Sequence, residues 1–174
     1  MVPVMSEQLE IICYPEPCLR RKAKPVDPID DTVREVAQRM IELMHEAEGV
    51  GLAAPQVNLS WRMFVTNSMQ EGDIDRVFIN PIVKNPTGDW ETREEGCLSL
   101  PEIAGDVRRP TQVTIEALDL DGKPFTMTSD GFSARIWQHE FDHLNGVLII
   151  DRFTQVSKLA TRRAVKTLEK RAKK

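Results

Sequence analysis

Residues 139–143 read HEFDH, and this short segment restricts the possible structure of the chain more than any other part of it. Residues four positions apart lie on one face of an α-helix, so two histidines with this spacing can bind one metal ion. The glutamate between them, Glu140, is then placed to act as a general base. The flanking residues, among them Phe132, Ile136 and Trp137, are largely apolar. Burying His-Glu-His there is costly unless the polar groups have a purpose, so the segment predicts a helix with a metal site.

A catalytic site of this kind has three protein ligands and one open coordination position. His139 and His143 supply two of the three. The extended motif with a third histidine six residues later is excluded, because position 149 is Ile149. Cys97 is a strong candidate, since the preceding Gly96 lets the backbone come close to a ligand. A distant carboxylate as third ligand and a purely structural thiol remain as alternatives.

A third pattern, GVGLAAPQ at residues 49–56, combines small residues with a terminal Gln56. Glycine and alanine let another chain approach the backbone closely, and the Gln56 amide can then donate a hydrogen bond to an oxygen that gains negative charge. The alternative is a tight connection between a helix and a strand, with Gln56 at the surface. A phosphate-binding loop is excluded, because no Lys-Ser/Thr pair follows and the pattern ends a helix instead of starting one.

The composition is that of a globular protein. The chain has 174 residues, about the length of one domain, and its 41% hydrophobic and 29% charged residues exclude a disordered or collagen-like chain. It holds no apolar run of the ~18 residues that a membrane-spanning helix needs, and its start, MVPVMSEQLE, does not resemble a secretory signal. Three cysteines, an odd number, favour reduced thiols over a disulfide framework. We expect one domain over residues 1–174, located in the cytoplasm.

The charge is distributed unevenly along the chain. Residues 158–174 hold eight basic residues and one acidic residue, a net charge of +7, whereas the rest of the chain has a net charge of −11. Such a basic tail on an acidic body suggests docking to an anionic partner. The alternative is a solvated, charged terminal helix without a partner.

Hydrophobic periodicity and turn signals predict the following secondary structure. Helices are expected at residues 31–47, with a capping box at Thr32 and Glu35, and at residues 129–144 and 154–170. Strands are expected at residues 9–13, 62–66, 77–78, 113–118 and 147–150, with a hairpin turn at residues 121–122. The region 51–128 as a whole consists of strands and turns in this interpretation.

Together, three ordered motifs resemble those of the peptide deformylases. That family carries GxGLAAxQ, EGCLS and QHExDHLxG, which stand here at Gly49–Gln56, Glu95–Ser99 and Gln138–Gly146. The segment Tyr14–Arg20 is also similar to the family's N-terminal YPDPxLR, and the resemblance covers about residues 9–153. It implies an α+β fold, with antiparallel β-sheets around a central HExxH-bearing helix, an N-terminal helix and a C-terminal helix.

The resemblance also implies roles for individual residues. The metal ligands would be Cys97, His139 and His143, and the general base Glu140. The oxyanion donors would be the side chain of Gln56 and the backbone N–H of Leu98, and the residues that support the site would be Gln138 and Asp142. The metal would be one divalent ion, Fe²⁺ in the cell, replaceable by Zn²⁺, Ni²⁺ or Co²⁺.

The implied reaction removes the formyl group from the N-terminal formylmethionine of new polypeptides and releases formate. Substrate-binding candidates are Val50, Gly51, Gly96, Leu98, Ile136 and the stem of Arg135. The implied partners are formylmethionyl nascent peptides and, through the basic tail, the ribosome, with no membrane; we expect a monomer, with a homodimer as the alternative. The competing interpretations are an HExxH zinc peptidase, whose third ligand is typically His or a carboxylate, and a non-catalytic ribosome-associated module. The presence of Glu140 argues against the module.

Overall fold

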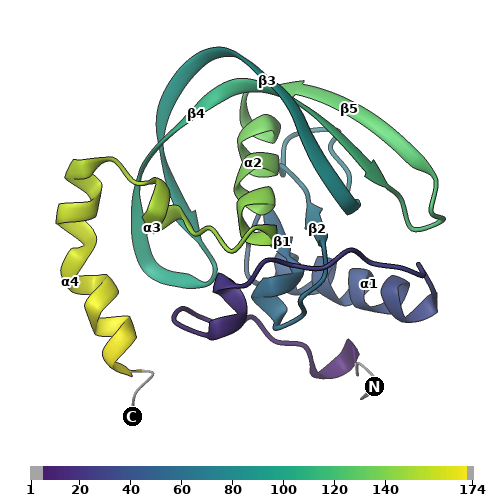
Figure 1. The fold of residues 1–174 in the computed structure, drawn as a ribbon, viewed down its shortest axis with the longest axis horizontal. Coiled ribbons are helices and arrows are strands. Elements are labelled where there is room, and N and C mark those ends of the chain that lie inside the picture. Colours follow the sequence, from purple (N-terminus) through teal and green to yellow (C-terminus); the bar gives the residue numbers. More distant parts are fainter. Residues whose placement is uncertain (1–5, 172–174) are drawn as a thin grey trace.

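The computed structural model describes residues 6–171 of the chain. One five-stranded antiparallel sheet, in the order β1-β2-β3-β4-β5, arches over helix α2, and this arrangement confirms the expected α+β class (Figure 1). The helices are α1 (Asp31–Glu46), α2 (Phe132–Leu144), α3 (Ile149–Arg152) and α4 (Gln155–Arg171), with short 3₁₀ turns η1 (Ser6–Gln8), η2 (Pro17–Arg20) and η3 (Ala54–Val57). The strands are β1 (Gly51–Ala53), β2 (Met63–Thr66), β3 (Arg76–Cys97), β4 (Leu100–Leu118) and β5 (Pro124–Asp130).

Helix α1 follows the predicted periodicity but begins at a different cap. Its buried residues are Val33, Val36, Ala37, Met40, Leu43 and Met44, which form one apolar face. The side chain of Asp30 accepts a hydrogen bond from the Val33 N–H, so Asp30 is the N-cap and the predicted capping box at Thr32 is wrong. The helix ends at Glu46, one residue before the predicted end.

Helix α2 is the central helix, and it carries the HEFDH segment, of which Glu140, Asp142 and His143 are buried. Its Trp137 packs against Phe78 of β3, with ring centroids 5.7 Å apart. The helix begins at Phe132 and not at Ser129 as predicted, because Ser129 pairs with Val113 in the β4–β5 ladder. Gly131, with φ +76°, makes the turn from strand to helix, a backbone conformation that side chains rarely allow.

The sheet contains longer strands than the sequence predicts. The predicted strands 62–66, 77–78 and 113–118 are present inside β2, β3 and β4, but β3 and β4 form one long hairpin. Much of β3 is polar and exposed and its register shifts at several points, so no clean alternation marks it in the sequence.

Two predicted strands are wrong. Residues 147–150 enter helix α3, in which Ile149 is buried beside Phe153; a short apolar run does not distinguish strand from helix by periodicity. Residues 9–13 form no strand, yet Ile12 and Tyr14 donate backbone hydrogen bonds to the Gln56 and Ser99 carbonyls, both at 2.8 Å. The N-terminal segment therefore connects two of the three motifs.

Helix α4 confirms the predicted C-terminal helix and packs on the body. Its buried or half-buried positions Ser157, Thr161, Val165 and Leu168 follow helical spacing, and the Ser157 hydroxyl accepts a hydrogen bond from the backbone N–H of Asp106 in β4 at 2.9 Å. Residues 172–174 of the basic tail lie outside the described residues. None of the helices within residues 6–171 has the length and apolar character needed to cross a membrane.

Candidate metal centre

Three side chains with metal-ligand chemistry meet at one point between α2 and the end of β3. The Nε2 atoms of His139 and His143 are 3.3 Å apart, and the Sγ of Cys97 lies 3.4 Å from Nε2 of His143. Two nitrogens bound to one tetrahedral zinc ion with bonds of ~2.05 Å are about 3.3 Å apart, and a nitrogen and a sulfur about 3.5 Å apart. Two of the three distances between donor atoms thus match the spacing that one four-coordinate ion requires, and all three donor atoms lie within 4.8 Å of one another.

The two imidazoles differ in their electrostatic surroundings. Burial and the neighbouring charges of His139 and Arg109 lower the pKa of His143 well below its ordinary value, so this ring is neutral and can offer a lone pair. Burial also lowers the pKa of His139, but hydrogen bonds with Cys97 and Glu95 outweigh it and raise that pKa well above the ordinary value. A metal ion bound to His139 would therefore have to displace a proton.

Glu140 lies on α2 between the two histidines of the donor cluster, and its side chain is buried. Its Oε2 has no hydrogen-bond partner among the described residues, and burial raises the pKa of the carboxyl to about 7. An unpaired buried carboxylate oxygen is costly unless it has a task. A carboxyl with a pKa near neutrality is suited to accept and return a proton.

Gly51 of β1 makes room for this carboxylate. A Cβ atom at residue 51 would lie 2.4 Å from Oε1 and 2.9 Å from Cγ of Glu140, closer than real side chains approach. The glycine of the first motif thus leaves the space that the Glu140 side chain of the third motif occupies.

We expect Gly51→Ala to move the Glu140 carboxylate and to lower kcat by about 10²-fold, the scale of a displacement of roughly 1 Å at a catalytic group. Metal content should stay unchanged, because Gly51 does not contact the donor atoms in the structure. Steady-state kinetics with metal analysis checks this, and a variant with wild-type kcat would show that the position of Glu140 does not matter.

Gln56 of η3 is buried and its amide is held in one orientation. Its Oε1 accepts a hydrogen bond from the backbone N–H of Ala53 at 2.9 Å, so its Nε2 faces Cys97 Sγ at 3.5 Å and Ser99 Oγ at 3.2 Å. The alternative of a surface glutamine is wrong, since Gln56 is 1% exposed. Leu98 lies in the tight turn between β3 and β4 and lines the same cavity as Gln56.

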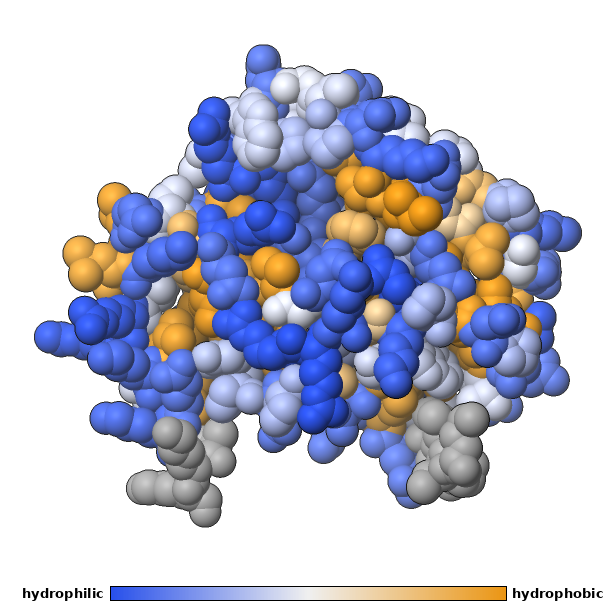
Figure 2. All heavy atoms as spheres, viewed as in Figure 1, coloured by the Kyte–Doolittle hydropathy of each residue, from blue (hydrophilic) through white to orange (hydrophobic). Residues whose placement is uncertain are grey.

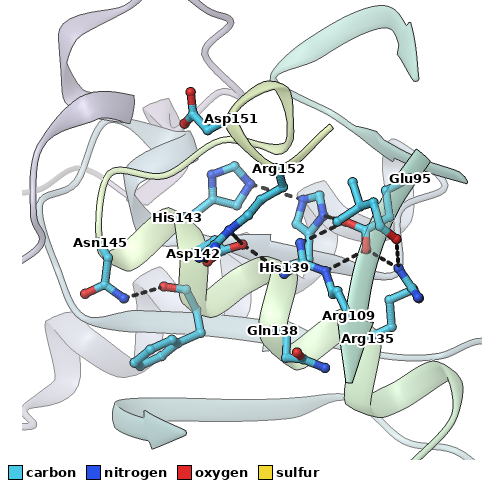
Figure 3. Close-up of polar contacts among 12 residues, drawn as sticks. Glu95, Arg109, Arg135, Gln138, His139, Asp142, His143, Asn145, Asp151 and Arg152 are labelled. Carbon is cyan, nitrogen blue, oxygen red and sulfur yellow. Dashed lines mark hydrogen bonds and ion pairs between the residues drawn. The ribbon is translucent and has the colours of Figure 1, made fainter. Parts of the chain in front are cut away.

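Glu95, which sequence reasoning placed in a motif but gave no role, connects His139 of the donor cluster to Arg109 of the sheet (Figure 3). It faces Nδ1 of His139 at 3.1 Å and accepts two hydrogen bonds from Arg109, from Nε at 2.7 Å and from Nη2 at 2.9 Å. Burial by itself raises the pKa of Glu95, but the hydrogen bonds from His139 and Arg109 outweigh it and hold that pKa far below its usual range. The partner of a ligating histidine fixes the direction of its ring.

Of the two predicted supporting residues, only Asp142 is connected to this network. Asp142 accepts hydrogen bonds from Arg109 at 2.9 Å and from Arg152 at 2.8 Å. Gln138 points away from the imidazoles, and its amide donates to the backbone carbonyls of Pro110 and Ala134, both at 3.0 Å (Figure 3). Gln138 thus ties α2 to β4 and makes no hydrogen bond to Cys97, His139 or His143.

The donor cluster opens into a cavity of about 690 Å³. The cavity is lined by all six predicted substrate-binding residues, Val50, Gly51, Gly96, Leu98, Arg135 and Ile136. Gln56, Cys97, His139 and Glu140 line it too. Because Gly96 has no side chain and a Cβ there would meet no atom within 4 Å, the backbone of β3 is open to a ligand at this point. The cavity thus brings a bound molecule to the donor atoms.

Comparisons with known proteins agree with this geometry. The family model described as polypeptide deformylase matches residues 8–159. Peptide deformylases of Stutzerimonas stutzeri and Pseudomonas aeruginosa are 45% and 46% identical to this chain, each over 93% of the chain and 95% of the relative. The solved structure of Plasmodium falciparum peptide deformylase is similar with a TM-score of 0.90 and 41% identity, over 94% of this chain and 97% of that one. This chain therefore belongs to the polypeptide deformylase family.

Proposed function

We propose that this protein is a metal-dependent peptide deformylase, which hydrolyses the formamide of N-terminal formylmethionine and releases formate and a free amine. The observation that carries the proposal is the convergence of Cys97, His139 and His143 beside the buried, unpaired Glu140, within a family of metal-dependent deformylases. The HExxH zinc peptidase is disfavoured, because the side chain that meets the two histidines is a cysteine.

We propose Cys97, His139 and His143 as the ligands of one divalent ion, Fe²⁺ in the cell, with Zn²⁺, Ni²⁺ or Co²⁺ as functional replacements. A thiolate and two imidazoles suit these transition metals and not Mg²⁺ or Ca²⁺, which prefer oxygen ligands. When bound, the ion lowers the pKa of a coordinated water and polarises a carbonyl oxygen.

Glu140 accepts a proton from the attacking water, whose oxygen forms a bond to the formyl carbon. The same carboxyl then gives a proton to the methionine nitrogen as the C–N bond breaks, so that formate and a free amino terminus leave. Burial supports this double role, since it places the pKa of Glu140 at about 7.

The formyl oxygen gains negative charge during the attack, and we assign Gln56 Nε2 and the backbone N–H of Leu98 as its hydrogen-bond donors. The fixed amide of Gln56 supports this, because a donor that is already oriented needs no rearrangement when the charge develops. Val50, Leu98, Ile136 and the stem of Arg135 are proposed to hold the methionine side chain. The peptide backbone is proposed to run past Gly51 and Gly96.

Gln56→Ala is expected to lower kcat by roughly 10²-fold, the usual contribution of one such donor. Metal content should change little, since the contact of Gln56 with Cys97 is a weak one at 3.5 Å. If the substitution raises KM and leaves kcat unchanged, Gln56 binds the ground state and does not stabilise the transition state.

Formate release from a formyl-Met peptide tests the proposed function directly, with an acetyl-Met peptide of the same sequence as the control. We expect formate and a new free amine in equal amounts, and no cleavage of internal peptide bonds. Cleavage inside the peptide without formate would instead indicate a peptidase.

We further propose that the protein acts as a monomer in the cytoplasm, where formylated chains leave the ribosome. Hydrophobic residues on the face shown in Figure 2 form small separate groups between hydrophilic ones, and this pattern is typical of monomers and not of permanent dimers. A homodimer is the alternative, which sedimentation equilibrium would detect.

Ribosome docking is proposed for the outer face of α4. The basic residues of the described part of this helix are all exposed, namely Lys158, Arg162, Arg163, Lys166, Lys170 and Arg171. The opposite face packs on the body, and the Tyr14 hydroxyl also donates a hydrogen bond to Glu169 at 2.8 Å. Val156 and Leu159 do not contribute to this packing, since they are 78% and 73% exposed. Removal of the helix would therefore expose core residues, and charge reversal is the cleaner test.

The triple variant Lys158→Glu, Arg162→Glu, Lys166→Glu is expected to fold and to release formate as the wild type does. Its cosedimentation with ribosomes at low salt should be lost, and the steep salt dependence that phosphate contacts produce should disappear with it. Equal cosedimentation of variant and wild type would exclude docking through this face.

A further inference from the structure

Arg135 lies four residues before His139 on α2 and is buried, although it is one of the residues that line the cavity. Its guanidinium donates to Glu95 Oε1 at 2.7 Å and to two backbone carbonyls, of Val107 at 3.1 Å and of Glu91 at 2.9 Å. These acceptors belong to both strands of the β3–β4 hairpin. The charged end of Arg135 is thus bound to the sheet, whereas a residue that recognises substrate by its charge would offer that end to the cavity.

Glu95 is held from two sides by this arrangement. Arg109 of β4 binds both carboxylate oxygens, and Arg135 of α2 binds Oε1 as a second donor. The remaining contact, from Oε2, goes to Nδ1 of His139. A bidentate arginine fixes the plane of a carboxylate. Arg135, which lies on α2 like His139, is a second donor to Glu95 and thereby fixes the distance between the Glu95 carboxylate and α2.

We propose that Arg135 is a positioning residue for the metal centre, which acts through Glu95 on His139. The proposal rests on the metal-dependent function above and assigns Arg135 a role beyond the pocket wall expected from the sequence. The contacts form one continuous path from Arg135 to Glu95, then to Nδ1 of His139, and through that ring to the ligand atom Nε2. Residues that orient a ligating histidine are typically worth 10- to 100-fold in metal affinity.

The test measures metal release from Zn²⁺-loaded protein by competition with a chelator. Arg135→Met removes the guanidinium and keeps much of the stem, and it should weaken Zn²⁺ binding about 10-fold, because Arg109 still holds Glu95. Arg135→Lys should restore part of the loss, since an ammonium group can reach Glu95 but cannot serve all three acceptors. It also provides a second measurement if the methionine variant folds poorly.

Arg62→Met is the matched control. Arg62 is also partly buried and donates to the Leu144 and Pro81 carbonyls, but it does not contact Glu95 or either imidazole. We expect this variant to lose thermal stability and to release Zn²⁺ at the wild-type rate. Arg135→Met with the same pattern as the control would show that Arg135 is only structural and would overturn the proposal.

A double-mutant cycle with Glu95→Gln tests the path itself. If Arg135 acts through Glu95, Arg135→Met should cause no further loss of Zn²⁺ affinity in the Glu95→Gln protein. A full additional loss would overturn the path, and a higher KM for formyl-Met peptides with unchanged Zn²⁺ affinity would make Arg135 a substrate-binding residue instead. If the wild type itself bound no Zn²⁺, the proposed metal-dependent function would be wrong. This result differs from the ones that would overturn only the role of Arg135.

Discussion

Glu140→Ala is expected to lower kcat about 10²–10⁴-fold while the protein retains its metal. The carboxylate moves protons in the proposed reaction, and it is not one of the three side chains that meet at the donor cluster. Its burial and its unpaired Oε2 show that no hydrogen bond of the described residues depends on that oxygen. Removal of the Glu140 carboxylate should therefore lower kcat and leave the positions of the three donor side chains unchanged.

Steady-state kinetics of formate release and metal analysis of the same sample give the two readouts for Glu140→Ala. Glu140→Gln is the isosteric companion, because it keeps the volume beside Gly51 and loses only the ability to take a proton. Both variants should lose activity to a similar extent. Stoichiometric loss of metal from both would mean that Glu140 is a ligand, in conflict with its proposed role.

Cys97→Ser is expected to abolish measurable turnover and to weaken metal binding strongly. A hydroxyl is a far poorer ligand than a thiolate for Fe²⁺ or Zn²⁺. The serine would keep the place of Cys97 in the fold, because the site is half-buried and the two side chains are similar in size. The loss should therefore appear in metal content and activity and not in stability of the metal-free protein.

Cys13→Ser is the matched control for this prediction, since Cys13 is exposed and is not part of the donor cluster. It should retain full metal content and full activity. If Cys97→Ser binds Zn²⁺ as tightly as the control does, Cys97 is not the third ligand, and a carboxylate has to be sought in its place.

Helical periodicity predicted the central helix and the relative position of His139, Glu140 and His143, because these depend on contacts within one turn. The order of the three motifs indicated Cys97 and Gln56 as site residues. Both lie far from α2 in the sequence, and this separation does not tell whether they contact the histidines. Only the fold shows that Gln56 Nε2 and His143 Nε2 approach the same sulfur atom, at 3.5 Å and 3.4 Å.

The support of the site could not be predicted in the same way. Glu95 lies opposite Gly105 in the β3–β4 ladder and Arg109 lies opposite Glu91, so the ladder register does not pair Glu95 with Arg109; their side chains meet across a hairpin that is polar and irregular over much of its length. The sequence made the stem of Arg135 a candidate for the methionine pocket, and Arg135 does line the cavity, but its guanidinium binds the sheet. The one available signal was Glu95 itself, two residues before Cys97, since alternate residues of a strand face the same side.

The packed face of helix α4 could not be predicted from the sequence either. Its packed positions include Ser157 and Thr161, so hydrophobicity alone does not reveal the inner face of the helix. The exposed Val156 and Leu159 mislead a prediction based on apolar residues, because they lie on the outer side. The hydrogen bond between Ser157 and the β4 backbone supplies the contact that an apolar stripe would otherwise make.

The most direct test of the account is a titration of metal-free protein with Fe²⁺ under anaerobic conditions, with formate release from a formyl-Met peptide as the signal. We predict that the rate rises with added metal and saturates at one ion per chain, and that the acetyl-Met peptide is not hydrolysed. A rate of formate release that does not depend on added metal, or no formate release at any metal concentration, would contradict the assignment of Cys97, His139 and His143 as the centre of a deformylase.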